Sequence, residues 1–242
     1  MFVSSTVLAV EPLPRPRSTR DRPAKPPLSE DLILDTALRV LREEGLEAVT
    51  MRRLATELDT GPASLYVYIE GRDELRNAML DRVSGMVEIE APDPSRWREQ
   101  VHALCQGVLQ IMEAHPGIAE VAVANPPTGE KTLRFAENLL ALLRAGGVTD
   151  QDAAWACDIL PLITTASAVE TAAYQRRGVE QKDHEAEVVD RLGQAFAALP
   201  PGEFPNVTAL ASELTSGDGD LRFRFAIDVF LDGLVARAAA RA

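Results

Sequence analysis

The 242-residue chain is poor in cysteine and aromatic residues, and it has no long apolar run. Its two cysteines, Cys105 and Cys157, are too few for a disulfide framework and lack the spacing of a metal site. No stretch reaches about 18 unbroken apolar residues, so no membrane-spanning helix is expected. The first residues contain neither a basic leader nor a long apolar segment, so we expect no signal peptide. These absences predict a cytoplasmic protein.

Signatures of catalysis and of bound cofactors are also missing. The sequence has no glycine-rich phosphate loop, no nucleophile elbow and no recognisable pair of catalytic carboxylates. His102 and Cys105 are three residues apart and His115 follows, but no second close pair of ligands completes a zinc site. We therefore predict no enzyme activity, no metal and no cofactor.

The sequence also lacks the alternating β-branched pattern of strands, and its apolar content is rich in Ala and Leu, which favours helices. An all-α chain is predicted. Residues 1–27 contain six prolines and five basic residues, which predicts a disordered basic arm. The linker APDPS at 91–95 indicates a boundary near residue 88, between a domain of residues 28–88 and a second of residues 89–242.

Helical periodicity and capping residues place the helices. Apolar residues recur three and four positions apart after Ser29, a capping residue, until Gly45 ends the helix. Further helices are predicted at 50–58, at 62–69 and from 73 to about 83. Beyond the linker, they are predicted at 95–114, 117–124, 130–145, 150–177, 183–198, 207–215 and 219–241.

The stretch TMRRLATELDTGPASLYVYIEGRDEL, residues 50–75, holds two short helical patterns around the turn Asp59-Thr60-Gly61. Such an arrangement, packed on a preceding helix, forms a helix-turn-helix, an element that reads DNA. The Thr50 hydroxyl at the first helix's N-terminus, with the nearby guanidinium groups of Arg52 and Arg53, suits a phosphate.

The second helix of this stretch offers small and aromatic side chains on its outer faces, while Leu65 and Ile69 are predicted to face inward. Small residues allow close approach to the major groove, and hydroxyl groups can bond phosphates or base edges. The pattern alone leaves alternatives open. In one alternative, the helix-turn-helix has only a structural role in a helical small-molecule-binding protein or an enzyme. In another, it binds protein in an adaptor.

The same stretch resembles the DNA-binding signature of the TetR (tetracycline repressor) family of bacterial transcriptional regulators. The upstream segment ILDTALRVLREEGLEAVT resembles that family's first helix. Two later segments, WREQVHALCQGVLQIMEAHPG and FAENLLALLRAGGVTDQDAA, resemble its tetracycline-repressor-like C-terminal half. The signature is matched at Thr50, Leu54-Ala55, the turn 59–61, Leu65-Tyr66-Val67-Tyr68-Ile69 and Arg72-Asp73-Glu74-Leu75.

The resemblance implies a homodimer that binds a palindromic, double-stranded operator and is released when a small-molecule effector fills the helical C-terminal domain. The sequence departs from the family pattern at Asp59, where Gly is frequent, and at Gly61, where a Ser cap is common. Pro62 and Ala63 cannot donate side-chain hydrogen bonds, which leaves the operator sequence open. By position, the implied DNA-contacting residues are Thr50, Arg52, Pro62, Ala63, Ser64, Tyr66, Tyr68 and Arg72.

The net charge of −12 is unevenly distributed. Residues 1–27 carry +3, residues 28–84 carry −5 and the remainder carries −10. This balance argues against a non-specific coat on nucleic acid but not against a small local contact surface. Acidic bulk charge would suppress non-specific DNA binding while a few cations hold phosphates. The basic arm either lies along a minor groove or is a disordered extension or the result of a misassigned start codon.

The helices predicted between residues 95 and 177 carry apolar stripes with isolated polar residues among them. A pocket for a small molecule is mostly apolar with a few placed polar groups. The final predicted helix has a broad apolar face. Paired with the helix at 150–177, it suits a four-helix dimer interface or burial within its own subunit, and the resemblance favours the dimer. Any single one of the polar candidates is more simply a surface residue or a satisfied interior group. The candidate ligand-binding residues are His102, Asn138, Trp155, Thr164, Thr165, Glu170 and Tyr174.

Overall fold

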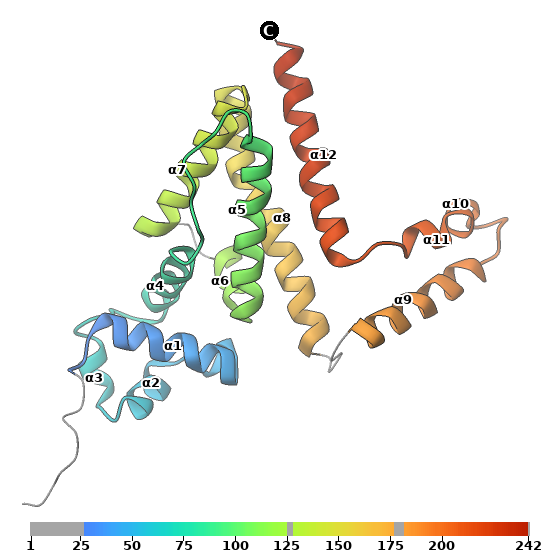
Figure 1. Ribbon diagram of the computed structural model, residues 1–242. Helices are drawn as coiled ribbons and strands as arrows, with labels where there is room; N and C mark the ends of the chain where they lie inside the picture. The colour runs from blue at the N-terminus through green and yellow to red at the C-terminus, as the bar shows by residue number, and fades with distance from the viewer. Residues whose placement is uncertain (1–26, 125–127, 177–181, 242) are drawn as a thin grey trace, which may run out of the picture.

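The computed structural model describes residues 27–124, 128–176 and 182–241, without the side chains of 174–176 and 182–187. The predicted arm therefore lies, except for Pro27, outside the described residues. No strand occurs in the described part of the chain, and the all-α prediction is confirmed (Figure 1). The elements are α1 (Glu30–Glu44), η1 (Leu46–Ala48), α2 (Met51–Glu57), α3 (Pro62–Leu65), α4 (Arg72–Ser84), α5 (Trp97–Ala114), α6 (Ile118–Ala124), α7 (Glu130–Ala145), α8 (Asp150–Arg176), α9 (Lys182–Ala197), α10 (Pro205–Ala209), α11 (Ala211–Leu214) and α12 (Gly219–Ala239).

Helices α1 to α4 form the head, and its first helix, α1, begins where the sequence predicts a helix. The Ser29 hydroxyl accepts a hydrogen bond from the Leu32 N–H at 3.2 Å and so caps α1. Gly45 ends this helix with a φ of 86°, a left-handed value that favours glycine. Asp59 takes a φ of 47° in the turn after α2, a conformation that a short polar side chain tolerates.

A second group of helices forms the body of the molecule. Helix α8 packs on α5, α6, α7 and α12, so it lies at the centre of this group (Figure 1). The connection from head to body is tied down by buried amides. Gln100 donates to the Ala91 carbonyl at 2.8 Å and accepts from the Asp93 N–H at 2.8 Å, while Asn138 donates to the Glu90 carbonyl at 2.9 Å.

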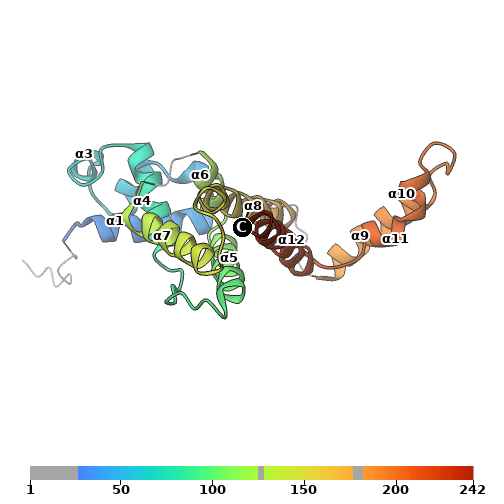
Figure 2. The same ribbon diagram turned by 90° about the horizontal axis from the view of Figure 1, so that it is seen from above.

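Helices α9, α10 and α11 form a projecting segment that packs mainly on itself (Figure 2). The predicted single helix at 207–215 is divided here at Leu210, which serves as the last cap of α10 and the first of α11. Within the described residues, no helix combines the length and apolar character needed to cross a lipid bilayer.

Two hydrophobic cores meet at α6. The head core is built from α1 to α4 but also takes in Ile118 and Val121 of α6, while α5, α7, α8 and α12 supply most of the body core. Ile111 and Met112, at the end of α5, pack against both cores. The head is therefore connected to the body by shared packing as well as by the chain.

A buried carboxylate fastens the last helix to the body. The Asp152 side chain is 1% exposed and accepts hydrogen bonds from Arg237 at 3.0 Å and Arg241 at 2.9 Å. Hydrogen bonding from Arg237 is the main reason why the pKa of Asp152 lies below its usual range. The start of α8 is thus held against the end of α12.

We expect Asp152→Asn to lower the thermal unfolding midpoint at neutral pH, because both guanidinium groups lose their charged partner. The folded state depresses the pKa of Asp152, so the stabilisation is complete above the unfolded pKa of about 3.9 and disappears as the pH falls through the lower folded value. Circular dichroism melts from pH 7 to pH 2 should show the two curves converge in acid. Asp150→Asn, in the same turn but 83% exposed beside Arg144, is the matched control and should change little. A constant difference at all pH values would contradict this account.

Candidate DNA-contacting surface and effector cavity

The outer surface of the head exposes the side chains that the sequence predicts there. Tyr66 and Tyr68 are 51% and 40% exposed, and Pro62 and Ala63 are exposed beside them, with Ser64 half-buried. The inward pair behaves as predicted too, because Leu65 and Ile69 are almost completely buried in the head core. The four-residue helix α3 is therefore held from below while its other faces stay open to solvent.

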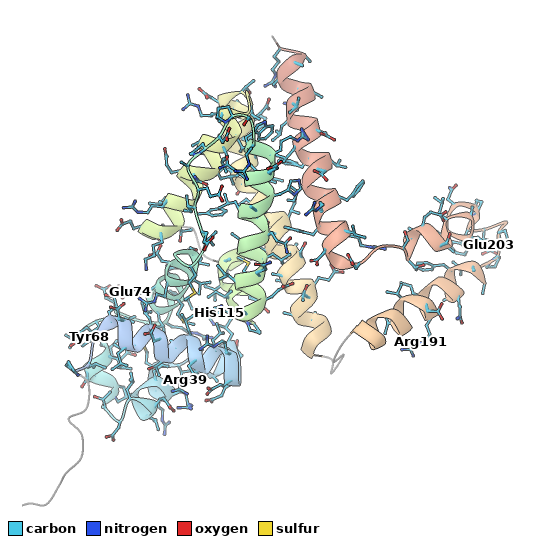
Figure 3. The ribbon with its side chains drawn as sticks, viewed as in Figure 1. Arg39, Tyr68, Glu74, His115, Arg191 and Glu203 are labelled. Atoms are coloured by element: carbon cyan, nitrogen blue, oxygen red, sulfur yellow. The ribbon has the colours of Figure 1, made fainter. Side chains whose placement is uncertain are left out.

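The predicted helix at 62–69 is shorter in the structure. Regular α-helix covers Pro62–Leu65, and Tyr66, Val67 and Tyr68 continue as turns. The N–H groups of Tyr68 and Ile69 both donate to the Leu65 carbonyl at 3.0 Å, so the chain tightens instead of continuing the helix. Both tyrosines of this exit are exposed, and Figure 3 labels Tyr68 at the edge of the head.

The first helix of the motif separates two arginines that the sequence treats alike. Thr50 accepts from the Arg53 N–H at 3.1 Å, which leaves its own hydroxyl hydrogen free to donate. Arg52 is exposed and has no ion pair among the described residues. Arg53 is bound on both sides, to Glu44 at 2.6 Å and to Glu57 at 2.7 Å. Of the two, Arg52 is free for a phosphate and Arg53 braces α2 against α1.

Two more predicted contact residues already have neighbours. The Tyr68 hydroxyl donates to the Leu28 carbonyl at 2.9 Å, which joins the motif to the start of α1 and leaves the hydroxyl oxygen as an acceptor. The Arg72 guanidinium lies 3.6 Å from the carboxylate of Glu47, and both side chains are more than half exposed. A pair of this kind is weak, so Arg72 can exchange Glu47 for a phosphate.

Several acidic residues of the head form close ion pairs with its own arginines. Glu57 accepts from Arg53 and Arg39, and these hydrogen bonds lower the pKa of its carboxyl group. Hydrogen bonds to Glu44 and, second, to Glu57 raise the pKa of Arg53. These pairs neutralise individual carboxylates locally, while residues 28–84 keep their net charge of −5. The pairs are Arg39–Glu43, Arg39–Glu57, Arg53–Glu44, Arg53–Glu57, Arg82–Asp31 and Arg82–Asp35.

A cavity of about 190 Å³ lies where the two cores meet. Leu80 and Val83 of α4 and Ile118 of α6 belong to the head core and also line this cavity. Ile111 and Met112, which pack against both cores, line it as well. The remaining wall comes from α5, α7 and α8, so a molecule in the cavity would contact head and body at once.

The lining of the cavity is mostly apolar with a few hydroxyl and acidic groups. Ser84 and Thr132 supply hydroxyls from α4 and α7, and Thr165 and Asp158 add polar atoms from α8. Burial raises the pKa of the Cys157 thiol, which keeps it uncharged. The lining residues include no Lys, Arg or His, so Asp158 is the charged group among them.

Most of the predicted ligand candidates lie elsewhere. Thr165 lines the cavity and also donates to the Pro161 carbonyl at 2.7 Å. Tyr174 falls outside the side chains that the structure describes. The placements of the other five are as follows: His102 bonds Asp228 of α12, Asn138 holds the Glu90 carbonyl, Thr164 is buried and donates to Leu160, Trp155 is exposed on α8, and Glu170 borders a separate hollow near α9 and α11.

The residues that sequence reasoning missed are mainly apolar. Val83, Phe135 and Leu162 line the cavity but carry no local signal that separates them from ordinary core residues. No three His, Cys, Asp or Glu side chains in the described part of the chain come together where they could hold a metal ion.

Comparisons with known proteins agree with this architecture. Residues 33–79 match the model of bacterial regulatory proteins of the tetR family, and residues 91–238 match the tetracyclin repressor-like C-terminal domain. The chain belongs to the TetR family. It is therefore a helix-turn-helix transcriptional regulator, which places it outside the enzyme families and supports the main interpretation of its sequence over the alternatives.

Relatives within the TetR family extend along most of the chain. The HTH-type transcriptional repressor DrrR1 of Streptomyces coeruleorubidus is 31% identical over 225 residues, covering 91% of this chain and 82% of that protein. Apo ActR from Streptomyces coelicolor superposes with a TM-score of 0.80 at 38% identity, covering 89% of this chain and 99% of that chain. The regulator SCO7222 of the same organism reaches a TM-score of 0.72 at 28% identity, covering 87% and 99%.

The contrast between the two arginines of α2 yields a test. We expect Arg52→Ala to weaken DNA binding and to reduce the slope of log affinity against log salt by about one, because one phosphate contact is lost. Fluorescence anisotropy between roughly 50 and 200 mM salt measures this slope. Arg53→Ala is the matched comparison: it leaves Glu44 without its arginine and Glu57 with Arg39 alone, and the first effect should be a lower unfolding midpoint. An unchanged salt slope in Arg52→Ala would remove that residue from the contact surface.

Proposed function

We propose that this chain is a repressor that binds a palindromic operator as a homodimer in the cytoplasm and is released by a small-molecule effector. Residues 28–88 form the DNA-binding unit in this proposal, and residues 89–242 bind the effector and dimerise. The observation that carries the proposal is the cavity shared between the head core and the body core. The repressor DrrR1, which is similar along most of its length, supports the direction of control.

The proposed DNA contacts come from one side of the head. Arg52, Tyr66 and Arg72 are exposed and either unpaired or weakly paired among the described residues. Pro62 and Ala63 offer no side-chain donors and allow α3 to approach the major groove closely. Thr50, Ser64 and Tyr68 complete the proposed surface with hydroxyl groups.

The proposed dimer interface uses apolar faces that the single chain leaves open. Helix α8 exposes Trp155, Ile159 and Leu162, which lie on one side of the helix at spacings of four and three. Helix α12 similarly exposes a row four residues apart, namely Leu221, Phe225 and Val229, at 60%, 68% and 52%. Two such helices from each subunit make a four-helix interface with a two-fold axis. The interface would fix the distance between the two heads.

The proposed effector acts through its place between the cores. By contacting Leu80 and Val83 it changes the packing of α4, and hence the position of the head. Effector binding then favours a state whose two heads no longer match major grooves about 34–36 Å apart. Structures of the relative ActR in complex with actinorhodin and with (S)-DNPA support ligand binding by a protein of this fold.

The proposed function is tested with the purified chain and its own upstream intergenic DNA. We expect saturable binding at nanomolar protein in fluorescence anisotropy with excess competitor, and a footprint over an inverted repeat. Phe225→Glu should give a monomer by light scattering and lose the footprint, because a charge enters the apolar interface. Leu133→Glu, also exposed but on α7, is the matched control. Failure to find a localised site in any genomic DNA would overturn the repressor function.

The charge of the cavity predicts its ligand class. Asp158 is the charged lining residue and basic residues are absent from the lining, so we expect cations to bind best and anions worst. Three fluorescent bicyclic probes test this: 1-naphthylmethylamine, 1-naphthalenemethanol and 1-naphthoate. Their size is appropriate because an apolar cavity of about 150 Å³ already holds benzene. Asp158→Asn should remove the advantage of the amine and leave the alcohol unchanged. Equal binding of the anion and the alcohol would contradict the assignment.

A further inference from the structure

One carboxylate of the head holds the first turn of a body helix. Oδ1 of Asp81, on α4, accepts hydrogen bonds from the N–H of Lys131 at 2.8 Å and of Thr132 at 3.0 Å, and from Oγ1 of Thr132 at 3.2 Å. Helix α7 needs such a partner, because its own cap is Gly129 and offers no side chain. A negative charge at a helix N-terminus is favourable. Asp81 therefore caps a helix that lies 50 residues further along the chain.

The close approach of Asp81 also leaves no room for a side chain at residue 129. A Cβ added to Gly129 would lie 2.1 Å from Oδ1 of Asp81 and 2.3 Å from its Cγ. The backbone of Gly129, with φ −72° and ψ 152°, suits any residue. The absence of a side chain is thus required by the approach of Asp81 and not by the backbone conformation.

The residue that Asp81 contacts also lines the cavity. The side chain of Thr132 lines it, and its Oγ1 lies 3.5 Å from Oγ of Ser84, which also lines it. A ligand that forms a hydrogen bond with either hydroxyl would disturb the hydrogen bonds between Thr132 and Asp81. The inference rests on the proposed function at this point, because it takes this cavity as the effector site.

The neighbours of Asp81 on α4 also connect this helix to the rest of the DNA-contacting head. Arg82, the neighbour of Asp81, binds Asp31 at 2.7 Å and Asp35 at 2.8 Å on α1. Leu80, on the other side of Asp81, is buried in the head core. Helix α4 is therefore joined to α1 by packing and by ion pairs, so a shift of α4 moves α1 with it.

We propose that Asp81 is a positioning residue that sets the orientation of the head relative to the body and transmits the occupancy of the cavity to it. Capping of α7 by Asp81 holds α4 against α7 at the cavity wall. Rearrangement at Thr132 or Ser84 loosens this hold, and the head turns with α4. The interaction is a discrete one, made or broken, as a two-state switch requires.

The test measures how strictly the dimer requires its half-site spacing. The test uses operators whose footprinted half-sites are moved apart by one or two base pairs. We expect the native protein to bind them at least about tenfold more weakly than the operator with native spacing, an effect within the roughly 5- to 150-fold range of typical coupling between sites. Asp81→Ala removes the cap and Gly129→Ala displaces Asp81 from the other side. Both should reduce that ratio to about threefold or less. Asp81→Asn keeps an acceptor oxygen and should restore most of it.

Controls separate positioning from stability. Glu130→Gln changes a charge in the same turn of α7 without touching Asp81, since Glu130 pairs with Arg134, and it should keep the native spacing preference. If Asp81→Ala and Gly129→Ala lower the unfolding midpoint but keep the native ratio, Asp81 is only a helix cap and the proposal fails.

A DNA-free measurement distinguishes this failure from failure of the proposed function. In Gly129→Ala, amide hydrogen exchange should become faster in α7's first turn and also in α4 and α1. Acceleration confined to α7 would overturn the positioning role even if the native protein binds no operator. If the native protein binds no operator but Gly129→Ala still accelerates exchange in α4 and α1, only the proposed repressor function is overturned.

Discussion

Helix α4 packs into the head core and at the same time lines the cavity, and this double role governs the rest of the structure. Leu80 and Val83 are buried in the head core, yet they also form part of the cavity wall. Packed interiors are dense and do not deform continuously, so a change in the cavity is passed on as a shift of whole elements. The structure therefore needs no long pathway between a ligand and the DNA-contacting head, because α4 belongs to the head core and also lines the cavity.

Charge in the head is arranged so that an acidic protein can still approach DNA. Arginines that brace the helices are paired with Glu44, Glu57, Asp31 and neighbouring carboxylates, while Arg52 stays unpaired among the described residues. Such pairing leaves few cations for general attraction to a phosphate backbone. A negative protein of this kind gains little from random DNA, and its affinity depends on the few groups that fit the groove.

Local signals predicted the geometry of the helix-turn-helix and of the helix before it. Capping by Ser29 and Thr50, the left-handed turn at Asp59 and the burial of Leu65 depend on residues within a few positions, and the structure has each of them. The cavity was not predictable in this way. Its wall combines residues from α4 to α8, and a residue such as Phe135 has the same helical spacing whether it fills a core or lines a cavity. Polar candidates such as His102 and Asn138 proved to hold helices and linkers together.

By itself, the sequence determined the all-α class, the helix boundaries within a few residues and the reading motif, because periodicity and capping act over one or two turns. The tertiary structure alone decided which arginine is free and which is paired, where α3 gives way to turns, and which side chains surround the cavity. It also decided that Asp81 caps a helix 50 residues away. These features depend on distances between segments that are far apart in the chain, and no local pattern encodes such distances.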